Sequence, residues 1–292
     1  MSLRTFKYHE PNMAQEAVAM LKKYGGNARV MAGGIDLVPR MRVGAINVDH
    51  LINIQNIKEL MCMDCDNSEG LKFRAMVTLH DLETSKVIKD KYGILYDAIH
   101  QITSVQTKHM GTAVGNLCVA TSGSDVATVL MALDAELIIT GVNGQRRQFL
   151  VDFYTGYQST TLKGDEMVTQ VIVPKPGPAK GAAFMNLVRT HCDCAKIIVA
   201  VAVDVENHIC KEARISLGSV SPTVFRAFEA ESLLQGHRID EVLIEEASEA
   251  AAKAARPITD LRSTDEYRQE MVRVLVRRAL AKAYEKAEEQ KK

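Results

Sequence analysis

The chain has 292 residues, of which 47% are apolar and 25% are charged, a composition typical of a globular protein with a substantial core. Its 36 Lys and Arg residues equal its 36 Asp and Glu residues, which argues against binding to nucleic acid or to an anionic membrane surface. The start of the chain lacks the apolar segment of a signal peptide, the longest apolar run (residues 197–203) is too short for a membrane span, and six Cys without a signal indicate a reducing cytoplasm.

An amphipathic helix is predicted for residues 11–26, because Ala17, Val18 and Leu21 recur on one face. Pro11 suits the first turn of this helix, and the Gly pair at 25–26 ends it. A strand at 28–32, a short helix at 35–44 and a buried strand at 50–54 follow. Together these segments predict a small β-α-β-like unit, which we assign to residues 1–57.

The sequence pattern changes at about residue 58, and we assign residues 58–177 to a second unit. Thr78, followed three residues later by Asp81, predicts the start of a helix. Residues 103–122 carry little helical period and are predicted to form a loop, which runs into a helix that Ser124 caps. The remaining expected elements are strands at 71–77, 135–140, 145–150 and 166–173 and a helix at 92–102, with a hairpin turn at 141–144 and a Pro-rich break after the last strand.

Residues 178–292 show strands first and helices afterwards. Strand-like runs occupy 181–189, 196–206 and 212–220, and three helical stretches follow, the last from about residue 264. This order predicts a separate α+β domain.

The cysteine and histidine positions point to no particular chemistry. Cys62 and Cys65 form a lone C-x-x-C, and the spacing of Cys192 and Cys194 suits zinc poorly, so we interpret all four as structural thiols. His109 and His191 lie in polar, Gly-containing segments, but no nucleophile or partner that would make either a catalytic base can be identified. We therefore predict no catalytic residue and no metal site on this chain.

Two glycine-containing segments carry the functional signal. Residues 29–42 place a Gly-Gly pair between two apolar runs, and residues 108–125 combine small residues, hydroxyls, an Asn and an Asp before a capped helix. Backbone N–H groups in such segments can donate to the phosphates of a ligand. A strand-to-helix turn for the first segment, and a tight structural crossover for the second, are the competing interpretations.

The order of these motifs closely resembles the FAD-binding medium subunit of the molybdenum hydroxylases, which include the xanthine dehydrogenase and carbon monoxide dehydrogenase flavoproteins. The resemblance starts with A-G-G-x-D-L at 32–37 and Q-x-x-x-x-G-T-x-x-G-N-x-C-x-A at 106–120. It continues through S-D at 124–125, A-L-D-A at 132–135 and F-x-x-x-x-R-x-x-x-D-x-A at 184–195, and therefore covers nearly the whole chain.

The resemblance implies a two-subdomain FAD-binding fold of the PCMH type, followed by a C-terminal α+β domain. It implies that residues 29–36 wrap the pyrophosphate, that residues 111–115 form a second wall braced by Asn116, and that Met167 or Val168 lies against the flavin. Ser124 and Asp125 would approach the ribityl chain or the ring. The implied cofactor-binding residues are Arg29, Val30, Met31, Ala32, Gly33, Gly34, Ile35, Asp36, Leu37, Gly111, Thr112, Ala113, Val114, Gly115, Asn116, Ser124, Asp125, Met167 and Met185.

The resemblance also implies partners. A large subunit would carry molybdopterin, a small subunit would carry [2Fe–2S] clusters, and NAD is a possible electron acceptor. The substrate of the complex would be chosen by the molybdenum subunit and is not encoded in this chain.

Three positions depart from the family pattern. Ile35 replaces a Thr, Val114 replaces a Gly at a point of close backbone approach, and Met185 replaces a common Lys. These departures motivate an alternative, a flavin-less assembly subunit of the same kind of complex. A stand-alone flavin oxidase is a third possibility, although no residue suited to a covalent flavin link is evident.

Overall fold

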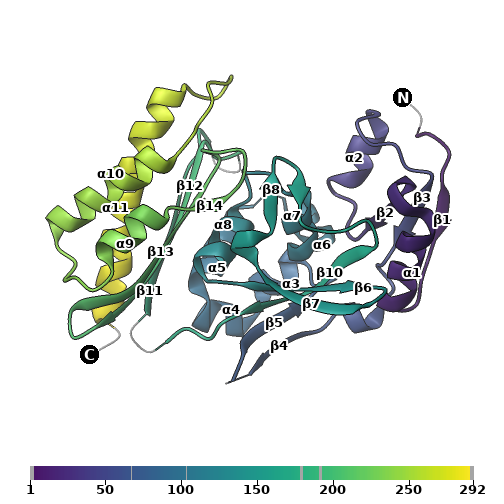
Figure 1. Ribbon diagram of the computed structural model, residues 1–292, viewed down its shortest axis with the longest axis horizontal. Helices are drawn as coiled ribbons and strands as arrows, with labels where there is room; N and C mark the ends of the chain where they lie inside the picture. The colour runs from purple at the N-terminus through teal and green to yellow at the C-terminus, as the bar shows by residue number, and fades with distance from the viewer. Residues whose placement is uncertain (1–2, 67, 103, 178–179, 191–192, 290–292) are drawn as a thin grey trace.

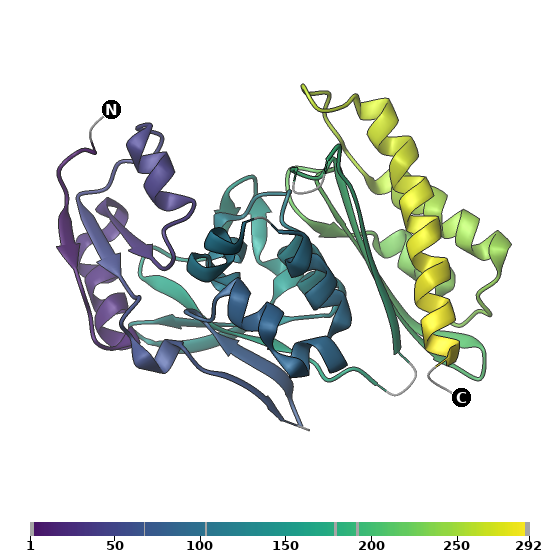
Figure 2. The same cartoon turned by 180° about the vertical axis from the view of Figure 1, so that it is seen from behind.

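The computed structural model describes residues 3–66, 68–102, 104–177, 180–190 and 193–289. His191 and Cys192, which were singled out above, lie outside these residues. Within the described chain, the protein consists of three units in a row, and the two ends of the chain lie at opposite ends of the molecule (Figures 1 and 2). No described helix combines the length and the apolar character that a membrane span needs.

The N-terminal unit is a three-stranded parallel sheet in the order β1-β3-β2. The helix between its first two strands begins at Ala14, later than predicted, with Met13 in the capping position, so Pro11 lies before the first turn. The helix ends at Tyr24, and the capping residue Gly25 donates from its backbone N–H to the Leu21 carbonyl with a φ of 57°, which glycine adopts readily. The elements of the unit are β1 (Lys7–His9), α1 (Ala14–Tyr24), β2 (Ala28–Met31), α2 (Leu37–Arg42) and β3 (His50–Asn53), with a 3₁₀ turn at Gly25–Asn27.

The central unit is built on a five-stranded antiparallel sheet in the order β4-β5-β10-β6-β7. Two hairpins, β4–β5 and β6–β7, flank the long strand β10. A small hairpin, β8–β9, projects from the same unit. The strands are β4 (Met63–Asp66), β5 (Gly70–Arg74), β6 (Glu136–Gly141), β7 (Gly144–Phe149), β8 (Tyr154–Gly156), β9 (Ser159–Thr160) and β10 (Glu166–Val173), with 3₁₀ turns at Lys58–Leu60 and Leu150–Asp152.

Helices α3 to α8 of the central unit lie between β5 and β6 in the sequence. The predicted capping box is present, because the Thr78 side chain accepts from the Asp81 amide while the Asp81 carboxylate accepts from the Thr78 amide. The prediction of a loop over 103–122 was wrong, since two short helices occupy most of this segment. The helices are α3 (Leu79–Thr84), α4 (Lys86–Lys91), α5 (Gly93–Gln101), α6 (Val105–Met110), α7 (Ala113–Val119) and α8 (Asp125–Ala132).

The C-terminal unit has four antiparallel strands in the order β11-β12-β13-β14, covered on the outer face by three helices (Figure 1). The strands-then-helices prediction is confirmed. The elements are β11 (Lys180–Leu187), β12 (Ile197–Glu206), β13 (Ile209–Gly218), β14 (Phe225–Arg226), α9 (Phe228–Leu234), α10 (Glu241–Ala254) and α11 (Asp265–Glu289).

Helix α8 joins the central and C-terminal units. Residues 126–132 of α8 are all buried, and the helix packs against β12 and β13. Gly218 of β13 is required for this contact, because a Cβ there would lie 2.6 Å from Thr128 Oγ1 and 2.9 Å from the Ser122 carbonyl oxygen. Asp134, just after α8, accepts from Arg214 and Arg226 of the C-terminal sheet, at 3.4 Å in each case. The two units therefore share both apolar and ionic contacts.

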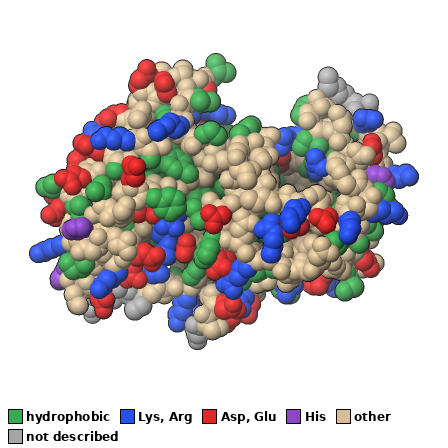
Figure 3. Space-filling view, in the orientation of Figure 1, with side chains coloured by type: hydrophobic (Ala, Val, Ile, Leu, Met, Phe, Trp, Pro, Cys, Tyr) green, Lys and Arg blue, Asp and Glu red, His purple; other side chains and the backbone are tan. Residues whose placement is uncertain are grey.

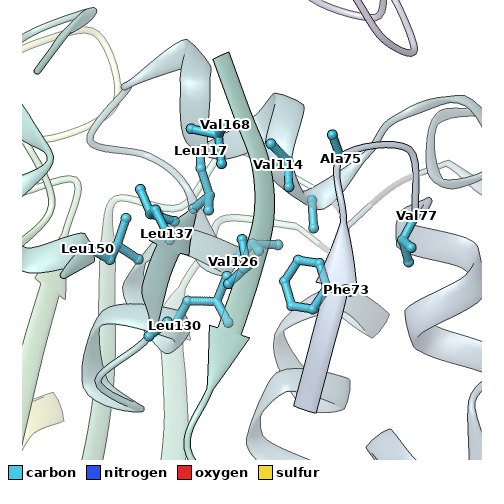
Figure 4. Packing of buried hydrophobic residues seen from close by; sticks show 14 of the residues in the cluster. Phe73, Ala75, Val77, Val114, Leu117, Val126, Leu130, Leu137, Leu150 and Val168 are labelled. Carbon is cyan, nitrogen blue, oxygen red and sulfur yellow. The ribbon is translucent and has the colours of Figure 1, made fainter. Parts of the chain in front are cut away.

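The apolar core follows the same architecture. One cluster spans the N-terminal and central units and extends to the inner face of the C-terminal sheet, and Figure 4 shows part of it around Phe73, Leu117 and Val126. A second cluster lies between the C-terminal sheet and helices α9–α11. Our division of the chain at residues 57 and 177 stays a prediction, although each predicted segment holds one of the three larger sheets.

Candidate functional site

A cleft of about 720 Å³ lies between the N-terminal and central units. The space-filling view shows this face of the molecule hollowed beside the N-terminal unit (Figure 3). Its volume is within the range of roughly 300–1,000 Å³ that small-molecule and cofactor sites occupy. Of the predicted residues, the structure brings fifteen to the cleft: the whole run from Arg29 to Leu37, together with Gly111, Thr112, Val114, Gly115, Asn116 and Met167.

The first wall of the cleft is the segment from β2 to α2. Among the described residues, none accepts a hydrogen bond from the amide N–H groups of residues 33–36. Gly34 has a φ of 71°, which only glycine adopts readily, and this turns the chain from the strand into the helix. Four successive free amides form a donor surface of the kind that binds phosphate oxygens.

Gly33 brings the first wall directly against the second. A Cβ at Gly33 would lie 1.7 Å from the carbonyl oxygen of Met110 and 3.1 Å from the Gly111 Cα. No side chain fits into that space, so the two backbones touch at the floor of the cleft. The two glycine-containing segments, 77 residues apart in the sequence at Gly34 and Gly111, are therefore parts of one site.

The second wall is the junction of α6 and α7. Thr112 caps α7 by accepting from the Gly115 amide at 3.0 Å, and it also forms a bridge to Thr78. Asn116 on α7 accepts a hydrogen bond from the Ser124 hydroxyl, which itself caps α8 by accepting from Ala127 at 2.9 Å. This chain of bonds fixes the wall to the buried helix α8.

Two of the departures from the family pattern lie on the cleft. Ile35 is 42% exposed at the mouth and its Cγ1 approaches Gly111. Val114 is only 4% exposed and belongs to the core cluster, where Figure 4 shows it among Ala75, Leu117 and Val168. The crowding predicted from its side chain is reduced, because the side chain packs inward and leaves little surface on the cleft.

The charged residues of the lining are mainly basic. Arg29, Arg40 and Lys163 line the cleft, together with the acids Asp36 and Glu166. The Arg146 guanidinium, outside the lining, lies 2.9 Å from Glu166, and its hydrogen bonding lowers the pKa of that carboxyl. The lining therefore has one more basic than acidic side chain, and its Arg and Lys groups are of the kind that contact an anionic ligand such as a pyrophosphate.

Ser124 and Asp125 start α8 beyond the lining of the cleft. Among the described residues, Asp125 Oδ1 is buried with no hydrogen-bond partner. Burial raises the pKa of Asp125 to about 6, against an opposing hydrogen bond from Asn186 of β11. A buried acceptor without a donor is the kind of atom that a bound ligand or water satisfies.

The two remaining predicted residues, Ala113 and Met185, do not line the cleft, whereas Met167 does. Met167 is 5% exposed and, with Val168, presents β10 to the cleft. Ala113 is fully buried behind the lining. Met185 does not reach the cleft, because its side chain packs against the C-terminal core cluster, on the opposite face of β11 from Phe184.

The Cys and His side chains of the described residues form no recognisable metal site. No set of three or more His, Cys, Asp or Glu side chains in the described ranges is placed to hold a metal ion. Cys118 lines the cleft, but burial raises the pKa of its thiol to about 12, so it stays protonated and weakly nucleophilic. His109 is exposed and stacks on His80 with ring centroids 3.7 Å apart.

Sequence reasoning missed several residues on the lining. Gln158 and Lys163 are polar and distant from the glycine motifs in the sequence, and only their positions in the fold bring them to the cleft, whereas Arg40 lies within the segment 29–42 and was not singled out. Arg40 offered one signal, since it follows Asp36 by four residues in a predicted helix and such pairs face each other.

Comparisons with known proteins agree with this geometry. Residues 4–176 match the family described as the FAD-binding domain in molybdopterin dehydrogenase, and residues 182–283 match the CO dehydrogenase flavoprotein C-terminal domain. The chain is 31% identical to the carbon monoxide dehydrogenase medium chain of Afipia carboxidovorans, over 97% of this chain and 98% of the relative. It is 28% identical to the glyceraldehyde dehydrogenase medium chain of Sulfolobus acidocaldarius, over 94% and 96% respectively.

A solved structure shows the same fold. The carbon monoxide dehydrogenase from Hydrogenophaga pseudoflava that lacks the Mo-pyranopterin moiety of its cofactor contains a chain that superposes with a TM-score of 0.94 at 30% identity, covering 98% of this chain and 99% of that one. The resemblance inferred from the motifs and the predicted fold class are both confirmed. The chain belongs to the family of FAD-binding medium subunits of the molybdenum hydroxylases, which are oxidoreductases.

Proposed function

We propose that this member of the family is the electron-transfer subunit of a cytoplasmic, multi-subunit molybdenum hydroxylase. In this proposal, electrons from the iron–sulfur clusters of a small partner subunit reach the FAD of this chain and leave to NAD or another acceptor. A large partner subunit carries molybdopterin and determines the substrate. FAD supplies the redox chemistry when bound, and the residues of this chain bind it, orient it and tune it.

The single observation that carries the proposal is the meeting of the two glycine-containing walls. The free amides of residues 33–36 supply donors for the pyrophosphate, and the contact of Gly33 with Met110 sets the width of the cleft at that point. The basic lining offsets the charge of the phosphates. Met167 and Val168 offer an apolar surface for the flavin side. The Oδ1 atom of Asp125, beyond the lining, has no partner among the described residues and is left to accept from the ribityl chain or the ring.

The alternative of a flavin-less assembly subunit rests on three residues. Met185 packs into the C-terminal cluster, and Val114 lines the cleft but has most of its side chain in the core, so Ile35 is the one of the three departures that is exposed at the cleft. An Ile at the exposed mouth removes one possible hydrogen bond and leaves the amide donors in place.

The test is to purify the full chain and titrate it with FAD, following the flavin absorbance and fluorescence. We expect FAD uptake at one site, with competition by ADP, because ADP carries the same pyrophosphate. Co-expression with candidate large and small subunits then tests the assembly, and electron transfer to NAD tests the acceptor. A folded chain that takes up neither FAD nor ADP would contradict the proposal in favour of the assembly subunit.

A further inference from the structure

One side chain crosses the open side of the cleft. Arg40 of α2 donates from Nη2 to the Gln158 side-chain oxygen at 2.6 Å, and from Nη1 to Asp36 Oδ2 at 3.3 Å. Gln158 lies in the turn between β8 and β9, 118 residues away in the sequence and on the central unit. All three residues line the cleft, so this bridge joins the N-terminal unit to the central unit across its mouth.

The far end of the bridge is fixed to the second wall. The backbone N–H of Gln158 donates to the Ala120 carbonyl oxygen at 2.8 Å, and Ala120 is the capping residue at the end of α7. Both residues have left-handed backbone conformations, with φ of 55° for Gln158 and 54° for Ala120, which residues other than glycine adopt infrequently. The β8–β9 turn is thus held in a defined position from which Gln158 reaches toward α2.

At the other end of the bridge, the Arg40 guanidinium retains donors that can bind a ligand. A guanidinium has five N–H donors in a planar fork that matches phosphate, and the two described bonds use one donor from each terminal nitrogen. The Arg40 side chain is 28% exposed, so it is neither locked in the core nor fully solvated. Asp36, its other partner, makes no side-chain bond to the start of α2.

We propose that Arg40 is a latch: it closes the cleft over the pyrophosphate of bound FAD, donating to the phosphate while its contact with Gln158 ties α2 to the β8–β9 hairpin. This inference rests on the proposed function, since it assigns a positioning residue to the same site. Asp36 and Gln158 hold the guanidinium at the mouth before the ligand arrives. The latch then acts chiefly on the rate of FAD release, because opening the mouth requires its contacts to break.

The experiment compares Arg40→Met with Arg42→Met in the full chain loaded with FAD. Arg42 is a matched control, because it lies on the same helix, is exposed and does not line the cleft. FAD release is followed as the recovery of flavin fluorescence after the loaded chain is diluted into excess ADP, which occupies the emptied site and prevents rebinding. We expect release about 10- to 100-fold faster in Arg40→Met, the effect of losing one or two charge-assisted hydrogen bonds, and no change in Arg42→Met.

Two further measurements separate the parts of the latch. Gln158→Leu keeps the phosphate donor and removes the bridge, so it should speed FAD release by a smaller factor than Arg40→Met. ADP should bind more weakly to Arg40→Met, whereas riboflavin, which has no phosphate, should bind it as it binds the unmodified chain. Equal release rates in Arg40→Met and Arg42→Met from a chain that holds FAD would overturn the latch alone. An unmodified chain that takes up no FAD would overturn the latch together with the proposed function.

Discussion

The contact between Gly33 and Met110 gives the sharpest prediction about the cleft. In Gly33→Ala the new Cβ would be 1.7 Å from the Met110 carbonyl oxygen, whereas real Cβ atoms keep about 3.0 Å or more from other heavy atoms. The two walls would therefore have to separate by about 1.3 Å. A hydrogen bond of about 2.9 Å that is lengthened by this amount is lost.

The magnitude follows from the bonds at stake. A hydrogen bond to a charged group contributes roughly 1.5–3 kcal/mol, so losing one between the amides of residues 33–36 and a phosphate should raise the Kd for FAD about 10- to 100-fold. Overpacking at the contact should also lower the free energy of unfolding by about 1–3 kcal/mol.

The assay is FAD titration by flavin fluorescence, with urea denaturation of the same samples. Gly26→Ala is the matched control, because a Cβ at Gly26 meets nothing within 4 Å and its φ is not in the left-handed region. We expect the control to bind FAD like the unmodified chain. Equal Kd values for the two variants would refute the argument that the backbone contact sets the width of the cleft.

Three further predictions concern buried residues. Asp125 has a raised pKa of about 6, so its contribution to stability is most favourable below the unfolded pKa and is lost as the pH rises from about 4 to 6. Asp125→Asn should flatten this part of the pH profile and stabilise the free chain above pH 6 by about 3 kcal/mol, measured by urea denaturation. An unchanged profile would show that the carboxyl is not buried. Val114→Gly should lower the free energy of unfolding by about 2–4 kcal/mol, because it removes a buried isopropyl group and places Gly in a helix. An unfolding midpoint like that of the unmodified chain would place Val114 outside the core. Glu231→Ala should lower the free energy of unfolding by about 3–5 kcal/mol, because Glu231 is 6% exposed and its loss leaves the mostly buried Arg226 without its closest partner. A decrease of less than about 1 kcal/mol, measured by denaturation, would mean that water reaches Arg226.

Most of the fold could be predicted from the sequence because its longer elements have clear periods. Residues 197–203 formed an unbroken apolar run, and this run is the buried first part of β12. The segment 103–122 could not be predicted, because α6 and α7 have only six and seven residues and are separated by Gly111. Helices this short depend on their caps and on packing rather than on a periodic pattern. Here Ser104 caps α6 and Thr112 caps α7.

The parts of the candidate site that glycine residues mark could be predicted from the sequence. The residues that the fold brings to the cleft from distant parts of the sequence could not. The Gly pair at 33–34 marked the first wall, since a tight turn and a close backbone approach exclude side chains. Val114 was expected to crowd the ligand, but the orientation of its side chain depends on the packing of α7 against β10, which a local motif does not encode. The bridge from Arg40 to Gln158 joins residues that no local pattern connects.

The position of β10 has a consequence for the synthesis of the protein. The hairpins β4–β5 and β6–β7 leave the ribosome before β10. Until β10 follows, strand β5 of the first hairpin and strand β6 of the second lack the neighbour with which each later pairs. The central sheet therefore remains open until residue 173 has emerged. A nascent chain that stalls after β7 has emerged and before β10 has emerged exposes two apolar strand edges and cannot yet hold the cofactor, so a pause in this interval would favour aggregation or chaperone capture.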